Sequence, residues 1–433
     1  MNKEVLRLAI PNILSNISVP LISSVDTALT GRLSDVHLGA VGIGAMIFNF
    51  LYWNFGFLRM GTTGMTAQAF GSERKPDIIH TLGRAFLVVG AIAAILVVFQ
   101  VPIGELSFKL MNISEKQYPF IAEYFYIRIW AAPATLGLMA LMGWFFGMQN
   151  AIYPMILTII IAAVNIVCSY VFVVHLKWDV AGVAWGTVIA QYVGLIVGVA
   201  LFFYRYRNYF EHYQQKALLT ISELKKFLVI NRDIFIRTLC LTLVFGFFYS
   251  QSSGEGELIL AVNVILLQLV NWMSYGVDGF AFAAESLVGK YQGAKDGKNL
   301  RKAIRSIFMM GMGMAVIYSL AYWIFSLPIV GLFTNEAHVI EATLPYLFWM
   351  VLFPTLATPC YIWDGIFIGL TASRAMRNGM LLSLIAFVGA YFIGLPYGNH
   401  GLWAALLVFM VGRGLIQWWM YVRRSVDLDV MVG

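Results

Sequence analysis

Apolar segments of about 20 residues recur along the 433 residues of this chain, and they constrain its fold more than any other feature. A helix needs about this length to cross the hydrocarbon core of a bilayer. Only 12% of the residues are charged, whereas soluble domains carry about 25%. The sequence therefore predicts an all-α polytopic membrane protein with twelve transmembrane helices, near residues 7–31, 40–63, 82–104, 120–147, 152–175, 180–204, 228–250, 257–284, 303–332, 342–371, 378–396 and 401–421.

The positive charges lie mostly on one side of these segments. With the N-terminus inside, most of the 29 lysines and arginines fall in cytoplasmic termini and loops, including the connection 205–237. Arg59 and Arg413 fall inside predicted helices. This positive-inside pattern predicts a protein of the bacterial inner membrane with both termini in the cytoplasm. Because the charges form no continuous basic patch, we expect no nucleic-acid partner. The first helix has no small-residue cleavage site after it, so we expect it to be retained.

Internal repetition divides the chain into two halves. The segment Gly143–Gly147 (GWFFG) matches Gly365–Gly369 (GIFIG), and three further short matches pair the two halves at nearly the same offset in sequence. The longest polar connection, near residues 204–233, separates two blocks of six helices. We therefore expect an N-lobe over residues 1–215 and a C-lobe over 216–433. Two halves with the same orientation imply a pseudo-twofold axis along the membrane normal, a plan of alternating-access transporters.

The first predicted helix carries a carboxylate among apolar residues. Asp26 shares a polar stripe with Asn16, and an ionised carboxylate within the membrane is costly, so it indicates a functional site. A capping role or an ion pair is the alternative. Pro11 and Pro20 lie in the same segment, and interior prolines remove backbone hydrogen bonds and bend helices. Both are candidate hinges.

Further polar residues lie inside predicted helices, and each has a structural alternative. A single asparagine in a helix bundle commonly forms a hydrogen bond to a neighbouring helix, and a carboxylate near a helix end commonly pairs with a cation of the adjoining loop. Asp364, in an otherwise apolar helix, favours a functional or interlobe role, and Asp278 lies deep in its own helix. The residues concerned are Asn165, Thr187, Gln191, Asp278, Glu285 and Asp364.

No signature of an enzyme is present in the sequence. It contains no GxxxxGK[ST] loop for nucleotide phosphates and no HExxH motif, and its three cysteines are too scattered for a metal site or a disulfide framework. We therefore expect no enzymatic activity, no cofactor and no bound metal. Transport would then depend on an ion gradient. A carboxylate in a low-dielectric site has a raised pKa and can bind a proton near neutral pH, which suits Asp26 to proton coupling.

Several segments carry a joint pattern: IPNILSNISVPLISSVDTALTG (10–31), LRMGTTGMTAQAFG (58–71), the NI run from Asn165, DVAGVAWGTVIAQ (179–191), AVN (261–263), DGFAFAAE (278–285), and WDGIFIG with RAMRNGM (363–380). Together they resemble the multidrug and toxic compound extrusion (MATE) transporters, within them the branch of DNA-damage-inducible protein F. The resemblance covers essentially the whole chain. It implies two six-helix lobes that export drug-like, often cationic or amphipathic, compounds in exchange for protons or sodium.

The resemblance also implies roles for individual residues. In proton-coupled members an aspartate on helix one follows a bendable proline by fifteen residues, as Asp26 follows Pro11 here. The Asn of helix five and the Thr of helix six match Asn165 and Thr187. A second aspartate commonly follows that Asn by four residues, where this chain has Ser169.

Sodium-coupled relatives use a Glu on helix seven and an Asp on helix ten. Asp364 resembles the second of these, but residues 239–249 of helix seven contain no acid. The sequence thus favours a monomeric, proton-driven exporter of small drug-like molecules in the lipid bilayer, with Asp26 as the coupling carboxylate and Asn165, Ser169, Thr187, Gln191 and Asn16 as a polar network in the cavity. The alternatives are a sodium-coupled antiporter with a candidate cation site at Asp364 and Asp278, a lipid-precursor flippase of the same superfold, and a receptor or scaffold without transport.

Overall fold

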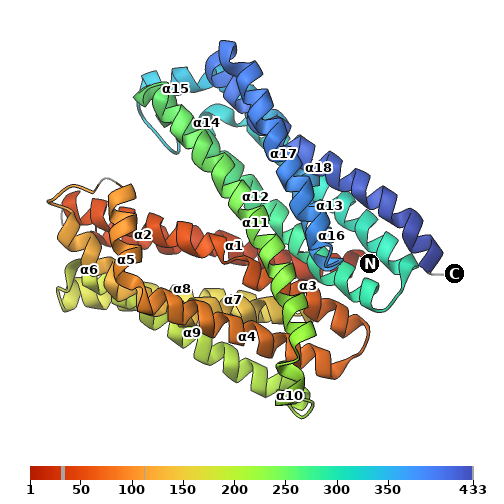
Figure 1. Cartoon of the computed structure of the whole chain (residues 1–433). Coiled ribbons are helices and arrows are strands. Elements are labelled where there is room, and N and C mark those ends of the chain that lie inside the picture. The colour runs from red at the N-terminus through yellow and green to blue at the C-terminus, as the bar shows by residue number, and fades with distance from the viewer. Residues whose placement is uncertain (31–34, 112, 432–433) are drawn as a thin grey trace. The chain divides into compact units, whose positions relative to one another are not determined.

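The computed structural model describes the backbone of residues 1–30, 35–111 and 113–431, and their side chains except those of 18–28, 30, 35 and 424–431. The described chain is almost entirely helical (Figure 1). Its α-helices are α1 (Asn2–Thr30), α2 (Asp35–Asn54), α3 (Phe57–Gly71), α4 (Lys75–Val98), α5 (Gln100–Leu110), α6 (Tyr118–Arg128), α7 (Ala132–Gly147), α8 (Ile152–Tyr170), α9 (Asp179–Phe210), α10 (Gln215–Leu218), α11 (Ile221–Gly254), α12 (Glu257–Gly293), α13 (Gly297–Ile324), α14 (Ser326–Val330), α15 (Ala337–Thr343), α16 (Leu347–Gly369), α17 (Ser373–Gly394) and α18 (Gly398–Met431).

The predicted transmembrane segments fall on these helices. The second segment is split, because α2 and α3 are separated by a turn at Phe55 and Gly56. In the described chain, nine stretches are long and apolar enough to cross a membrane, and one of them, Ser373–Arg423, contains α17 and the part of α18 up to Arg423. Several helices begin with a proline in the first turn, where the missing N–H costs no hydrogen bond, as Pro76 does in α4.

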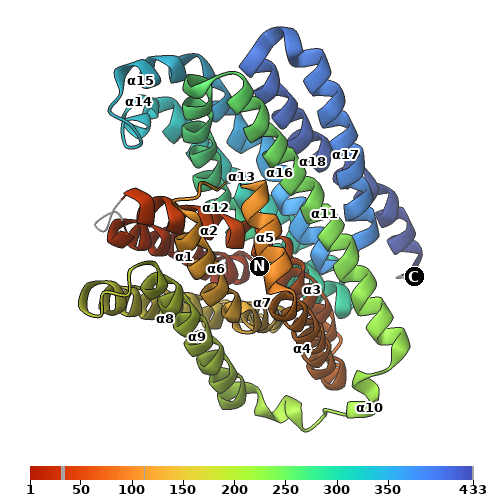
Figure 2. The same ribbon diagram turned by 60° about the vertical axis from the view of Figure 1, so that its left-hand side comes forward.

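The chain folds into two compact units, which we call the N-unit (Leu14–Leu228) and the C-unit (Met1–Ile13 with Val229–Gly433). Helix α1 contributes to both, because its first residues pack in the C-unit and the rest belongs to the N-unit. Within the N-unit α8 and α9 run side by side, and within the C-unit α17 and α18 do so (Figures 1 and 2). The lobe boundary expected at residue 215 stays a prediction.

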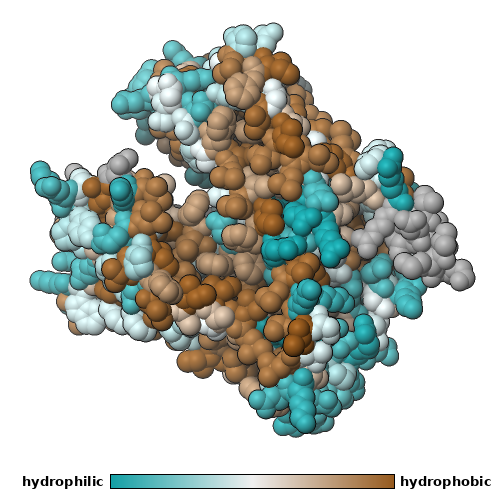
Figure 3. All heavy atoms as spheres, in the orientation of Figure 1, coloured by the Kyte–Doolittle hydropathy of each residue, from teal (hydrophilic) through white to brown (hydrophobic). Residues whose placement is uncertain are grey.

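Each unit has its own aromatic core. In the N-unit, Trp144 of α7 is fully buried against Phe202 and Tyr206 of α9 and donates an indole hydrogen bond to the carbonyl oxygen of Ile78 at 2.9 Å. On the face seen in Figure 3, hydrophobic residues cover the middle of the helices and hydrophilic residues gather over α10. So much exposed apolar surface would be unfavourable in water and fits a lipid environment.

The internal repeat has a structural counterpart in backbone packing. A side chain at Gly143 of α7 would place its Cβ 2.4 Å from the carbonyl oxygen of Arg59 in α3, and one at Gly365 of α16 would lie 2.2 Å from that of Ala281 in α12. The two glycines and the two carbonyl groups are separated in sequence by the same offset. The two GxxxG segments therefore bring equivalent helix pairs into close contact in the two units.

The ends of equivalent helices repeat as well. Glu73 and Lys295 adopt left-handed backbone angles with φ of 56° and 55°, and Gln149 and Thr371 do so with φ of 62° and 50°. The two residues of each pair are separated by the same number of residues as Gly143 and Gly365. A non-glycine residue in this region is uncommon, so four such residues in matching pairs indicate that both units follow one plan.

Candidate coupling and substrate sites

Two of the predicted polar residues meet between α8 and α9 in the N-unit. Asn165 is 2% exposed, and its side-chain amide donates a hydrogen bond of 3.1 Å to the hydroxyl oxygen of Thr187. The Thr187 hydroxyl donates in turn to the carbonyl oxygen of Val183, four residues earlier in α9, at 3.2 Å. The hydrogen bond joins the two helices in the second half of α8.

Ser169 lies one turn beyond Asn165 on the same helix face and is fully buried. A Cβ at Gly186 would lie 2.5 Å from its hydroxyl oxygen, so glycine is needed there for α9 to approach α8. Within the described chain, neither Oδ1 of Asn165 nor Oγ of Ser169 has a hydrogen-bond partner. Buried polar atoms nearly always have one, from protein, water or ligand. This face of α8 is therefore suited to bind water or a polar ligand.

A π-helical turn, Val171–His175, follows directly on α8. Such turns are rare, and they occur frequently at functional sites because they redirect the helix and free backbone groups. Ser169 lies two residues before this turn. Gln191, one turn after Thr187 on α9, is half-buried and shares the helix face of that residue.

The first helix is continuous from Asn2 to Thr30. Asn16 and Pro11 are half-buried on it, and both have interactions with neighbouring groups. The side chains of Pro20 and Asp26 lie outside the described residues, although the backbone is helical at both positions.

The beginning of α1 is anchored to α12 within the C-unit. The Tyr291 hydroxyl donates to a carboxylate oxygen of Glu4 at 3.1 Å, and Lys290 approaches the other oxygen at 3.6 Å. A Cβ at Gly279 would lie 2.8 Å from the carbonyl oxygen of Ala9, so the two backbones are in close contact. Pro11 lies within the part of α1 that belongs to the C-unit, two residues before the change of unit after Ile13.

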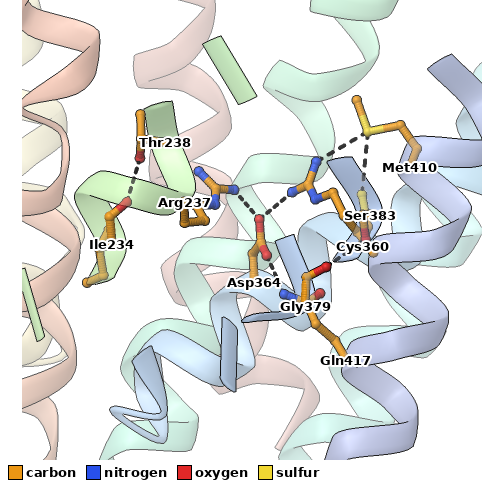
Figure 4. A network of polar contacts seen from close by, with 10 residues as sticks. Ile234, Arg237, Thr238, Cys360, Asp364, Gly379, Ser383, Met410 and Gln417 are labelled. Atoms are coloured by element: carbon orange, nitrogen blue, oxygen red, sulfur yellow. Dashed lines mark hydrogen bonds and ion pairs between the residues drawn. The ribbon is translucent and has the colours of Figure 1, made fainter. Parts of the chain in front are cut away.

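Asp364, on α16, is the centre of a buried charge network in the C-unit. It is 5% exposed, and its oxygen Oδ2 is contacted by the guanidinium groups of both Arg237 and Arg413. The other oxygen accepts a hydrogen bond of 2.6 Å from the side-chain amide of Gln417. Figure 4 shows Arg237, from α11, and Gln417, from α18, converging on the Asp364 carboxylate. Both carboxylate oxygens are thus occupied by donors.

Together, Asp364, Arg237 and Arg413 carry one net positive charge. Arg413 and Gln417 are almost completely buried, and the Nε atoms of Arg237 and Arg413 have no hydrogen-bond partner in the described part of the chain. Asp278 is half-buried on α12, the helix that packs against α16.

A second ion network lies one turn earlier on α11. Asp233 is fully buried and accepts hydrogen bonds from Arg377 at 2.8 Å and from Ser373 at 3.2 Å, both on α17. Asp233 and Arg237 are four residues apart and share one face of α11. This face thus attaches α11 to α16 and α17 through charges of opposite sign.

Sequence reasoning missed Arg237 as a partner of Asp364. The charge pattern placed it at the end of the cytoplasmic connection, whereas in the structure it lies well inside α11, which begins at Ile221. The available signal was the pair Asp233 and Arg237 at helical spacing, which predicts one charged face rather than a loop. The internal repeat could not point to a charge network at Asp364, because the equivalent position in the first half of the chain is Met142.

No group of three or more His, Cys, Asp or Glu side chains that could hold a metal ion occurs among the described residues.

Comparisons with known proteins agree with this architecture. The family model MatE matches the chain twice, over residues 11–171 and 234–397. The chain is 36% identical over 418 residues to DNA damage-inducible protein F of Escherichia coli strain K12, covering 96% of this chain and 90% of the relative. It is 23% identical over 430 residues to the probable multidrug resistance protein NorM of Bacillus subtilis strain 168, covering 96% and 92%.

Solved structures show the same fold. A MATE crystal structure in the bent conformation superposes with a TM-score of 0.91 at 18% identity, covering 99% of this chain and 96% of that one. An outward-facing multidrug resistance MATE transporter of the MOP superfamily gives a TM-score of 0.88 at 18% identity, covering 98% and 96%. This confirms the predicted fold of twelve transmembrane helices in two lobes. The family model covers most of the sequence and a relative matches at 36% identity, so the chain belongs to the MatE family of multidrug and toxic compound extrusion proteins, which are membrane transporters and not enzymes.

Proposed function

We propose that this transporter exports cationic or amphipathic drug-like compounds in exchange for protons, and that Asp26 on α1 is the coupling carboxylate. The observation that carries the proposal is the occupation of Asp364, the rival carboxylate, by Arg237, Arg413 and Gln417. A coupling carboxylate must bind and release its ion during every cycle. One that is already paired with two guanidinium groups is poorly suited to that role.

The charges around Asp364 oppose a sodium ion on physical grounds. A cation at either oxygen would lie near two positive groups in a buried site, where unit charges about 4 Å apart interact by several kcal/mol. It would also have to displace the amide of Gln417, which donates to Oδ1 at 2.6 Å. These considerations argue against the sodium-coupled alternative through Asp364 and favour the carboxylate of α1.

The polar groups of α8 and α9 support a substrate or hydration site in the N-unit. Asn165 and Thr187 are joined by a hydrogen bond, and the oxygens Oδ1 of Asn165 and Oγ of Ser169 lack partners among the described side chains. We assign these residues, with Gln191 and Asn16, to the network that responds when Asp26 gains or loses its proton.

We further propose that α1 bends at Pro11 and Pro20 when Asp26 is protonated. The anchorage of Glu4 to Tyr291 and the change of unit after Ile13 support Pro11 as the principal hinge. Proline leaves the helix without one backbone hydrogen bond, which lowers the cost of bending.

The cellular setting is proposed from the charge distribution. The basic connection 205–237 and the basic termini support a multi-pass protein of the bacterial inner membrane with both termini in the cytoplasm. We expect a monomer in contact with membrane lipid, with small molecules and not nucleic acid as its partners. The lobes would be residues 1–215 and 216–433.

Reconstitution into proteoliposomes tests the coupling ion. Uptake of a cationic dye into inside-out-oriented vesicles is followed under a pH gradient alone and under a sodium gradient alone, with the membrane potential clamped in both. The proposal expects uphill transport with the pH gradient only. Transport that follows the sodium gradient at constant pH would assign the coupling to sodium instead.

A further inference from the structure

An apolar groove lies on the N-unit where α4, α7 and α9 meet. Its volume is about 180 Å³, and essentially all the surface that lines it is apolar. The lining residues include Ile79, Gly83, Phe86, Val199, Phe203 and Phe210. A dry apolar cavity of about 150 Å³ holds a benzene-sized group, so this groove can take a segment of one hydrocarbon chain and gives water no hydrogen-bond partner.

Gly83 makes room at the floor of the groove. A Cβ at this position would lie 2.6 Å from the side chain of Leu218 in α10. That segment is held against α4 by Arg84, which donates hydrogen bonds to the carbonyl oxygens of Ala217 and Leu218 at 3.0 and 3.4 Å. One end of the groove is therefore bounded by the docked connection that follows α9.

Two of the three helices that line the groove, α4 and α9, carry a basic residue on the lining face. On α9, Val199, Phe203, Arg207 and Phe210 follow at spacings of four, four and three residues, so they share one face. On α4, Lys75 lies four residues before the lining residue Ile79.

Arg207 and Lys75 are exposed, and neither forms an ion pair with a residue that the structure describes. Figure 3 shows hydrophobic residues over α4 and α9 and hydrophilic residues over α10. An apolar groove thus continues into a positively charged rim.

We propose that this groove is a binding site for an anionic phospholipid from the leaflet on the side of α10. One acyl chain lies along Val199, Phe203 and Phe86, and the negatively charged headgroup meets Arg207 and Lys75. Basic residues near a membrane surface attract anionic lipid by about 1 kcal/mol each. The aromatic rings of Phe210 and Tyr213, which also line the groove, are stacked with an interplanar angle of 2°, and aromatic residues are enriched at membrane interfaces. The bound lipid would reinforce the docking of α10 on α4.

Native mass spectrometry of the delipidated full-length protein in detergent tests the proposal. Phosphatidylglycerol and phosphatidylcholine with identical acyl chains are titrated separately, and glycerol phosphate is titrated as the headgroup without a chain. The wild-type protein is expected to retain one phosphatidylglycerol in preference to phosphatidylcholine. The double variant Lys75→Gln with Arg207→Gln is expected to bind phosphatidylglycerol about 25-fold more weakly, which corresponds to about 2 kcal/mol.

Two matched controls separate this site from general lipid binding. Lys225→Gln with Lys226→Gln removes two exposed charges of the same unit outside the groove and should leave the preference intact. Val199→Trp fills the groove and should lower binding of both lipids, whereas Val316→Trp, on the exposed face of α13, should not. Equal retention of both lipids by the wild-type protein, full retention by Val199→Trp, or equally tight binding of glycerol phosphate alone would overturn the proposal.

Discussion

Replacing Asp364 by asparagine is expected to destabilise the protein more than replacing either of the arginines that contact it. The carboxylate is buried and paired with both Arg237 and Arg413. In Asp364→Asn two buried guanidinium groups remain without a counter-charge, whereas Arg413→Met leaves Asp364 balanced by Arg237. The net charge of these three side chains is +1 in the wild-type protein. It becomes +2 in Asp364→Asn and zero in Arg413→Met.

The magnitudes follow from the cost of breaking buried ion pairs. Removing one partner of such a pair typically costs about 3–5 kcal/mol, because the other charge stays buried without compensation. We expect a loss in this range for Asp364→Asn. Arg413→Met loses a charge-assisted hydrogen bond worth about 1.5–3 kcal/mol, but no charge is left uncompensated. The triple variant Arg237→Met, Asp364→Leu and Arg413→Met removes all charges together and should be more stable than Asp364→Asn.

Unfolding of the purified variants in mixed micelles, with rising mole fractions of sodium dodecyl sulfate and followed by circular dichroism, measures these differences. Glu336→Gln is the control, since this carboxylate is exposed and, among the residues that the structure describes, its ion pair is with the exposed His338. Its effect should stay within about 0.5 kcal/mol. If Asp364→Asn is as stable as the wild-type protein, or less damaging than Arg413→Met, the buried charges are compensated by other groups and the reasoning is wrong.

Three further predictions concern backbone packing, pH and the hinge. Gly365→Ala should destabilise by about 1–3 kcal/mol, because its Cβ would lie 2.2 Å from the carbonyl oxygen of Ala281; Gly389→Ala, which meets no atom within 4 Å, should be neutral or stabilising in the same unfolding assay. A hydrogen bond from a backbone N–H of its own helix lowers the pKa of Asp296, the N-cap of α13, so the cap stabilises the folded state above the usual aspartate pKa and is lost as the pH falls through the lowered value. The protection factors of the amides at the start of α13, which compare the measured exchange rate with the intrinsic rate at the same pH, should therefore fall at acidic pH in the wild-type protein and be low at all pH values in Asp296→Ala; identical profiles of protection against pH would contradict this. Pro11→Ala should slow dye efflux while substrate binding, measured by fluorescence titration, persists; unchanged turnover would rule out Pro11 as a hinge.

The transmembrane architecture was predictable because it depends on local composition. A bilayer admits few solutions for apolar segments of about 20 residues, and each predicted segment falls on a helix. The repeat was visible as GWFFG and GIFIG, and its physical reason is close helix packing at Gly143 and Gly365. The break between α2 and α3 was missed, because hydropathy continues through Phe55 and Gly56 while the helix does not.

The partners of buried charges were not predictable. Arg237 and Asp364 are 127 residues apart in the sequence, and only tertiary packing brings them together. The charge pattern counted Arg237 with the basic connection 205–237, although the apolar segment predicted from residue 228 already included it. In the structure α11 begins at Ile221, which puts Arg237 about 24 Å along the helix at 1.5 Å per residue. Arg237 is buried there, so its charge requires a buried counter-charge, and Asp364 provides it.

The most direct test of proton coupling through Asp26 compares two transport modes of Asp26→Asn in proteoliposomes. Asparagine keeps the size of the side chain and removes the titratable charge, so the variant should still exchange labelled for unlabelled dye across the membrane at equal concentrations. It should fail to accumulate dye against a concentration gradient when a pH gradient is imposed, whereas the wild-type protein does both. Uphill, pH-driven accumulation by Asp26→Asn at the wild-type rate would contradict the account.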